Sequence, residues 1–218
     1  MKADLSEWFE AQGKDKWFAF GFTTLPLALR GNLESMDINK KNENGYDLTA
    51  VLFTPDKESP ETVESLVDFS EKVDATWQHS PDGKKHEVTL LNVSAGMEGE
   101  RTLKLSVSSN KLGVEKADVV TVSVPDQNDF SVYDVTYVSE PERYVEVAFT
   151  KLLDVAQDMR GLAFIAENTS ETVTVDGNKL RLYPDADLWQ KGVMNIHLNQ
   201  GIRSKSGLNL KEAVVRQI

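Results

Sequence analysis

Few side chains in this sequence have the type and spacing that catalysis or metal binding requires. The chain has no cysteine, which excludes disulfides, thiolate zinc sites and cysteine nucleophiles together. Its three histidines, His79, His86 and His197, do not have the spacing of metal ligands, and we interpret all of them as surface residues. A nucleophile elbow, a phosphate-binding loop and a dinucleotide fingerprint are all absent from the sequence. We therefore predict a protein that is not an enzyme and has no catalytic residue, cofactor or metal ion.

Acidic residues are abundant, but they do not single out a catalytic pair. The chain has 35 Asp and Glu residues against 24 Lys and Arg, which gives a formal net charge of −11. Acid–base catalysis needs two carboxylates brought together, and none can be picked out of so many scattered ones. Binding to phosphate groups needs clustered basic side chains, so this charge argues against nucleic acid as a partner. The charge predicts an acidic surface that keeps the protein in solution.

One acidic stretch has the composition of a calcium site. The segment Val122-Ser-Val-Pro-Asp-Gln-Asn-Asp129 resembles the linker between cadherin domains, where Asp-x-Asn-Asp supplies oxygen ligands, and Asp185-Ala-Asp187 is similar to a second cadherin element. Calcium takes roughly six to eight oxygens, so the linker alone is not sufficient. The acidic motif that the preceding domain contributes in cadherins is missing, and we expect a solvated linker without calcium. The candidate ligands are Asp126, Asn128, Asp129, Glu98, Glu100, Asp134 and Asp185.

The elements that would position such groups are mostly strands, because apolar and polar residues alternate along much of the sequence. Turn signals such as Pro81-Asp-Gly83 and Asp176-Gly-Asn178 separate the alternating segments. Many short strands without intervening helices predict an all-β fold of the sandwich type. The alternating or β-branched segments are 48–53, 101–107, 119–124, 144–149, 172–175, 179–182 and 194–198.

Two segments have helical features. Asp4 to Gln12 is predicted to form a short helix capped by Asp4. Ser59-Pro60-Glu61 is a favourable helix start, whereas we interpret Leu66 to Phe69 as a strand. We therefore expect helices only as short additions to the sheets.

Two stretches of the chain repeat a common pattern. Ser65 to Asp74 matches Tyr144 to Asp154, and Pro81 to Lys85 matches Val175 to Lys179 further downstream. A repeated unit indicates two domains, since one immunoglobulin-like sandwich needs about 100 residues. The pattern predicts two tandem immunoglobulin-like domains.

The domain boundaries follow from this repeat. We assign residues 46–125 to the first domain and 130–218 to the second, and we expect residues 1–45 to belong to the first domain. The polar stretch Pro125 to Asp129 between them is short, so the two domains are expected to contact each other.

Several of these strands resemble a known protein family. Phe130-Ser-Val-Tyr-Asp-Val-Thr-Tyr137, Tyr144-Val-Glu-Val-Ala-Phe-Thr150 and His197-Leu-Asn-Gln-Gly-Ile-Arg203 are similar to the N-terminal region of bacterial alpha-2-macroglobulins of the Bacteroidetes type. Phe69-Ser-Glu-Lys-Val-Asp-Ala-Thr-Trp77 resembles the matching strand pair of the preceding domain in that region. The resemblance covers residues 46–218 and is better in the second domain.

The family implies a non-catalytic scaffold or spacer within a large envelope protein that traps proteases after they cleave a bait region. The implied partners are the other domains of the same longer chain and, through the full-length protein, proteases. The implied location is periplasmic or anchored at the outer membrane, after removal of an export signal. The longest apolar stretch, Trp17 to Leu29, is interrupted by Gly21 and Pro26, so we expect no membrane span. The alternative is a cell-surface adhesin or glycan-binding module built from the same immunoglobulin-like units.

Overall fold

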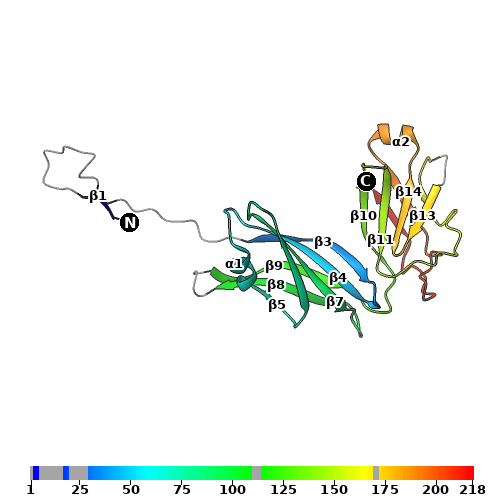
Figure 1. Ribbon diagram of the computed structural model, residues 1–218. Helices are drawn as coiled ribbons and strands as arrows, with labels where there is room; N and C mark the ends of the chain where they lie inside the picture. Colours follow the sequence, from blue (N-terminus) through cyan, green and yellow to red (C-terminus); the bar gives the residue numbers. More distant parts are fainter. Residues whose placement is uncertain (1, 5–16, 20–28, 110–113, 169–171) are drawn as a thin grey trace.

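A computed structural model describes residues 2–4, 17–19, 29–109, 114–168 and 172–218 of the chain (Figure 1). The fold is all-β, as expected, and is built from antiparallel sheets. The described residues contain two short helices, α1 (Pro60–Leu66) and α2 (Ala186–Lys191). Neither helix is long enough or apolar enough to cross a membrane.

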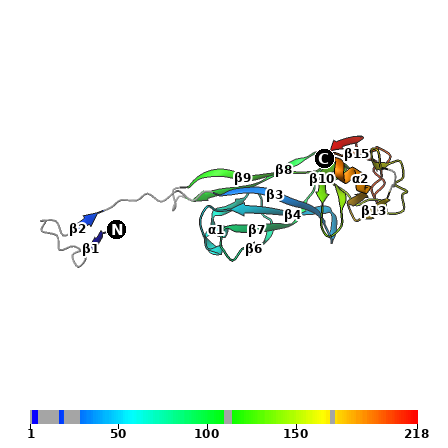
Figure 2. The same cartoon turned by 90° about the horizontal axis from the view of Figure 1, so that it is seen from above.

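The first unit consists of two sheets in separate layers, which Figure 2 shows with β8 and β9 lying over β3, β4 and β7. Inward side chains of both sheets, such as Leu48, Leu90 and Leu103, belong to one buried apolar cluster. Burial of alternate residues on each strand is what holds two sheets face to face. The larger sheet has the order β3 (Arg30–Asn39), β4 (Asn42–Phe53), β7 (Lys85–Ser94), β6 (Asp74–His79), and the smaller one β5 (Val67–Phe69), β8 (Arg101–Ser109), β9 (Val114–Val124).

The second unit has its own buried core between another pair of sheets. Val145, Val147 and Phe149 are fully buried on one face of their strand, as the alternation predicts. The rings of Phe130 and Phe149 lie against each other in this core, with their centroids 5.5 Å apart. The larger sheet has the order β10 (Val132–Val138), β11 (Tyr144–Phe149), β14 (Lys179–Tyr183), β13 (Thr172–Asp176), and the smaller one β12 (Ala163–Ile165), β15 (Asn195–Leu198), β16 (Val214–Gln217).

The two units share one strand order, but the repeat expected from the sequence is partly misaligned. When the strands of each unit are counted from its first strand, β10 corresponds to β3, β11 to β4 and β12 to β5. The turns near Asp82 and Gly177 do correspond, because they join β6 to β7 and β13 to β14. The match of residues 65–74 with 144–154 is wrong, since it equates β5 with the counterpart of β4. Alternation is common to all half-buried strands, so it cannot tell one strand from another.

The ends of the expected elements also differ in detail. The domain start expected at residue 46 lies inside β4, which pairs with β3 from Arg30 onwards. Helix α1 begins at the expected place, with the Ser59 hydroxyl accepting the Thr62 N–H at 3.2 Å, and the chain turns into β5 after Leu66. Of the helix expected from residue 4 to residue 12, only the first residue is described. Asp4 is the last residue of β1 (Lys2–Asp4), which pairs with β2 (Trp17–Ala19). Residues 5–12 of the expected helix lie outside the described residues.

Candidate functional site

The two units meet at a joint that begins with the linker, residues 125–129. The Gly96 N–H donates to the Pro125 carbonyl at 2.9 Å, and the Gln127 N–H donates to the Gly96 carbonyl at 2.8 Å. A side chain at Gly96 would not fit, because a Cβ there would lie 1.9 Å from the Gly99 carbonyl oxygen. The linker is therefore bonded to the β7–β8 loop of the first unit along its backbone.

The two linker aspartates, Asp126 and Asp129, contribute to this structure through their carboxylates. Asp126 accepts the Gly99 N–H at 2.6 Å and the Asn128 N–H at 2.7 Å, one on each oxygen. These backbone hydrogen bonds hold the pKa of Asp126 below its usual value. Asp129 lies 3.3 Å from the Lys211 ammonium of the second unit. Both carboxylates thus already interact with protein donors, which would compete with a calcium ion for them.

The other oxygen ligands considered for calcium are only partly near the linker. Glu100 lines a shallow hollow together with the linker aspartates, and Glu98 is exposed on the same β7–β8 loop. Asp134 accepts hydrogen bonds from neighbours on its own strand, β10. Asp185 precedes α2, at the end of the second unit away from the joint (Figure 1). Within the described part of the chain, no three His, Asp or Glu side chains form a group suited to a metal ion.

Two tyrosines, one buried and one partly buried, cross the joint in opposite directions. Tyr46 of β4 is 1% exposed, and its hydroxyl donates to the Thr150 carbonyl of the second unit at 3.0 Å. Tyr133 of β10 donates in return to the Met36 carbonyl of β3. Burial, followed by the charge of the linker aspartates, raises the pKa of Tyr46 to about 12, and burial also raises the pKa of Tyr133. Both hydroxyls therefore remain protonated donors at neutral pH.

The acceptor of Tyr46 is itself fixed in place. Thr150 is 1% exposed, and its hydroxyl donates to the Asp129 carbonyl at 3.0 Å and accepts the Ser131 N–H at 3.0 Å. The Thr150 N–H donates in turn to the Ser131 carbonyl at 2.9 Å. The bond from Tyr46 is thus made to a carbonyl that the linker and the start of the second unit already hold.

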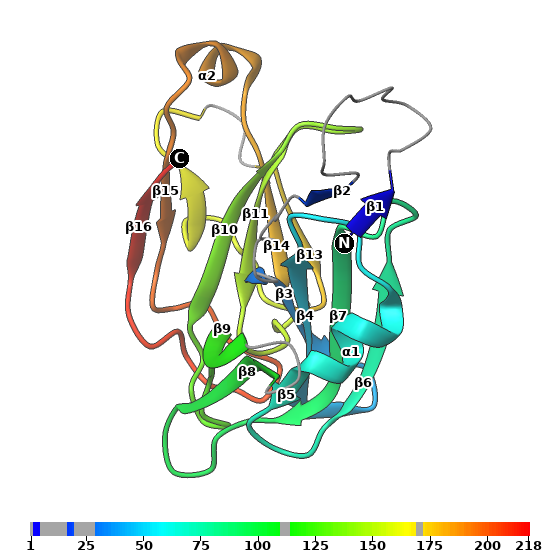
Figure 3. The ribbon, with the colours of Figure 1, turned by 90° about the vertical axis from the view of Figure 1, so that its left-hand side faces the viewer.

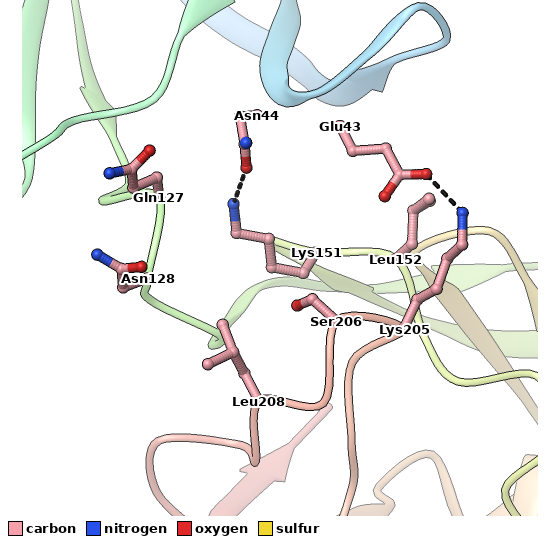
Figure 4. Close-up of a pocket in the computed structure, with 9 residues that line it drawn as sticks. All are labelled: Glu43, Asn44, Gln127, Asn128, Lys151, Leu152, Lys205, Ser206 and Leu208. Atoms are coloured by element: carbon pink, nitrogen blue, oxygen red, sulfur yellow. Dashed lines mark hydrogen bonds and ion pairs between the residues drawn. The ribbon is translucent and has the colours of Figure 1, made fainter.

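Charged and amide side chains surround a polar hollow of about 370 Å³ at the joint (Figure 4). Lys151, which is 6% exposed, points across the joint and donates to the Asn44 side-chain carbonyl at 3.2 Å. Lys205 forms an ion pair with Glu43 at 2.5 Å. Burial lowers the pKa of Lys151, since its ammonium has left bulk water for a neutral partner. The contacts across this hollow join the start of β4 to two loops of the second unit.

The histidines are less exposed than the surface positions expected of them. His86 is fully buried, and its Nδ1 atom lies 2.8 Å from Nδ1 of His79, so its interpretation as a surface residue is wrong. The reason is strand register, because the hairpin through Pro81 pairs His79 of β6 directly with His86 of β7. The equal distance of the two histidines from that turn was the signal that sequence reasoning missed. His197 is half-buried and stacks on the Phe164 ring, with centroids 4.9 Å apart.

Sequence reasoning anticipated a contact between the units but none of the side chains that make it. The joint brings together residues of β3, β4, β10 and the loop after β11, which are far apart in the sequence. Its donors and acceptors are paired with each other, which is an arrangement for holding two units in one orientation. Comparison with known proteins found no matching family model, no matching curated protein and no matching solved structure.

Proposed function

We propose that this chain is a rigid tandem of two immunoglobulin-like sandwich domains that acts as a non-catalytic scaffold. The observation that carries the proposal is the reciprocal pair of hydrogen bonds across the joint, from Tyr46 to Thr150 and from Tyr133 to Met36. A single contact between two units leaves a hinge, whereas two contacts on different strands restrict bending in more than one direction. The Lys151–Asn44 bond adds a third point of attachment.

The energetic scale of the joint favours one dominant orientation. Each buried hydrogen bond contributes about 0.5–1.5 kcal/mol net. The exposed ion pair of Lys205 with Glu43 adds at most about 1 kcal/mol. Bending of the joint would separate the tyrosine hydroxyls from their acceptors, and a buried polar group left without a partner costs about 1–3 kcal/mol. A rod that keeps its shape is what a spacer needs.

The resemblance to bacterial alpha-2-macroglobulins gives this scaffold a context. The stretch Phe130 to Tyr137, which carries part of that resemblance, contains the joint residue Tyr133. We place the chain in the N-terminal spacer of an alpha-2-macroglobulin-like protease inhibitor of the bacterial envelope. Its partners are then the remaining domains of the longer protein, which bring it into contact with proteases.

Residual dipolar couplings measured by NMR test the rigid tandem. If the two units keep a single relative orientation, the couplings of each unit give an alignment tensor of the same orientation and the same magnitude. A double Tyr46→Phe and Tyr133→Phe variant is expected to show unequal tensors, because one unit then moves relative to the other. Unequal tensors in the unmodified chain would contradict the proposal.

A separate test addresses the inhibitor context. The complete gene is expected to encode a bait region and further macroglobulin-like domains. The chain by itself is expected neither to hydrolyse ester, peptide or glycoside substrates nor to inhibit proteases. A short gene with a glycan-binding or cell-wall-binding domain would contradict this context and favour the adhesin alternative. The rigid tandem would stand in either case.

A further inference from the structure

Outside the joint, four polar side chains of the first unit form a chain of hydrogen bonds beneath helix α1. Glu64 of α1 lies 3.1 Å from Nε2 of His79, measured from its carboxylate oxygen. The Nδ1 atoms of His79 and His86 are 2.8 Å apart, and Nε2 of His86 lies 3.4 Å from the hydroxyl of Thr54, just after β4. These hydrogen bonds connect α1 with β6, with β7 and with the residue that follows β4, and Figure 3 shows α1 beside β6 and β7.

The contact between the two rings limits the number of protons that the pair can carry. A hydrogen bond between two nitrogen atoms needs one protonated and one bare nitrogen. When His79 is charged it donates to Glu64 on one side and to His86 on the other, and His86 stays neutral. If His86 also takes a second proton, two N–H groups point at each other and the bond between the rings is lost.

Burial and surrounding charges act on the two rings unequally. His86 is fully buried, whereas the His79 side chain is 15% exposed at the edge strand β6. Burial, followed by the charge of His79, lowers the pKa of His86, while the Gly83 carbonyl favours its charged form. The charged groups that face the pair are Glu61 and Glu64 of α1, Lys57 and Glu58 before it, and Asp82 in the β6–β7 turn.

Helix α1 depends on contacts with the rest of the first unit to keep its position. It connects the larger sheet to the smaller one and buries Val63 and Leu66, which are 0% and 3% exposed. With seven residues it is too short to persist as an isolated helix. Its attachment therefore comes from packing of these two side chains and from the bond between Glu64 and His79.

We propose that the chain Glu64–His79–His86–Thr54 is an acid-sensitive latch on helix α1. The latch holds α1 against the larger sheet while one of the two facing nitrogens carries no proton. It opens when His79 and His86 are both charged. Repulsion between the two charged rings displaces the His79 ring, and Glu64, which is bonded to that ring, moves with it. Helix α1 is thereby shifted from its place, and the apolar side chains of Val63 and Leu66 become exposed. Acid thereby changes the surface of the first unit without acting on the joint.

The direction of the pH dependence follows from the difference between the folded and unfolded chain. The pKa of His86 is lower in the folded chain than its ordinary value of 6.5, so the unfolded chain takes up the proton first. The stability of the first unit is therefore full above pH 6.5 and falls as the pH drops below it. One proton changes the ratio of folded to unfolded chain by at most about tenfold per pH unit.

NMR of the unmodified chain tests the latch directly, because the protein has only three histidines. At pH 7.5 we expect a scalar coupling between the ring nitrogens of His79 and His86 through their hydrogen bond. Acidification should remove this coupling together with the hydrogen-exchange protection of the amides of α1, after correction for intrinsic exchange rates. His197 stacks in the second unit and serves as the internal reference. No coupling at pH 7.5, or protection of α1 that survives the loss of the coupling, overturns the proposal.

Two substitutions provide the matched comparison. His86→Gln keeps a hydrogen-bonding side chain that cannot take a proton, and it is expected to remove most of the acid-induced decrease in the melting temperature of the first unit. His197→Gln is expected to retain the full decrease. Equal pH dependence of the unmodified chain and His86→Gln overturns the latch. If His86→Gln does not fold, the NMR measurement on the unmodified chain decides.

Discussion

Replacement of Tyr46 by Phe tests the joint through the loss of a single oxygen atom. The ring stays in the first core, and only the hydroxyl that donates to the Thr150 carbonyl at 3.0 Å is removed. Because Thr150 is 1% exposed, its carbonyl loses this partner in a place that water does not readily reach. An unpaired buried group of this kind costs about 1–3 kcal/mol of the free energy of unfolding.

The reciprocal bond allows a double-mutant cycle. Tyr133→Phe removes the donor to the Met36 carbonyl and is expected to cost a similar amount. Both bonds depend on one docked orientation, so the loss of either weakens the other. We expect the double variant to lose less free energy than the sum of the single variants, with a coupling of about 0.5–3 kcal/mol.

Chemical denaturation followed by tryptophan fluorescence measures these losses. Tyr137→Phe is the matched control, since Tyr137 is 49% exposed and its hydroxyl has no hydrogen-bond partner among the described residues. The control is expected to stay within about 0.5 kcal/mol of the unmodified chain. If Tyr46→Phe and Tyr133→Phe are as stable as this control, or if their effects simply add, the joint does not act as one rigid contact.

Three further predictions concern pH, the second core and calcium. Because the pKa of Tyr46 is about 12 in the folded chain against 10 in the unfolded chain, its contribution to stability is full below pH 10 and is lost towards pH 12. Alkaline unfolding followed by circular dichroism should show a smaller loss in Tyr46→Phe than in the unmodified chain. Phe149→Ala removes a fully buried ring and should cost about 3–5 kcal/mol in urea denaturation, and a loss below 1 kcal/mol would contradict the assigned core. Millimolar calcium should leave the melting temperature unchanged in scanning fluorimetry, because no three acidic or histidine side chains of the described residues form a group suited to a metal ion. An increase of several degrees that Asp129→Ala abolishes would contradict this.

Much of the secondary structure could be predicted because it depends on neighbours in the sequence. Side chains alternate between the two faces of a strand, so burial of one face marks segments such as 101–107 and 144–149 directly in the sequence. Ser59 before Pro60 marks the start of α1 in the same local way, through a side-chain cap and a residue that needs no N–H donor.

The candidate site could not be predicted from such signals. Tyr46 and Thr150 are separated by 104 residues, and nothing beside either residue indicates the other. The pairing of His79 with His86 was within reach, since it requires only the register of one hairpin. Full burial of His86, however, depends also on the elements that cover this end of the sheet.

By itself the sequence determined the all-β class, the positions of most strands and turns, and the absence of cysteine chemistry. These properties follow from composition and from period-two alternation, which are local. Only the tertiary structure decided which strands correspond between the two units, how the linker aspartates are used and which side chains close the joint. Those properties arise when segments distant in the sequence pack together, and each depends on the position of several elements at once.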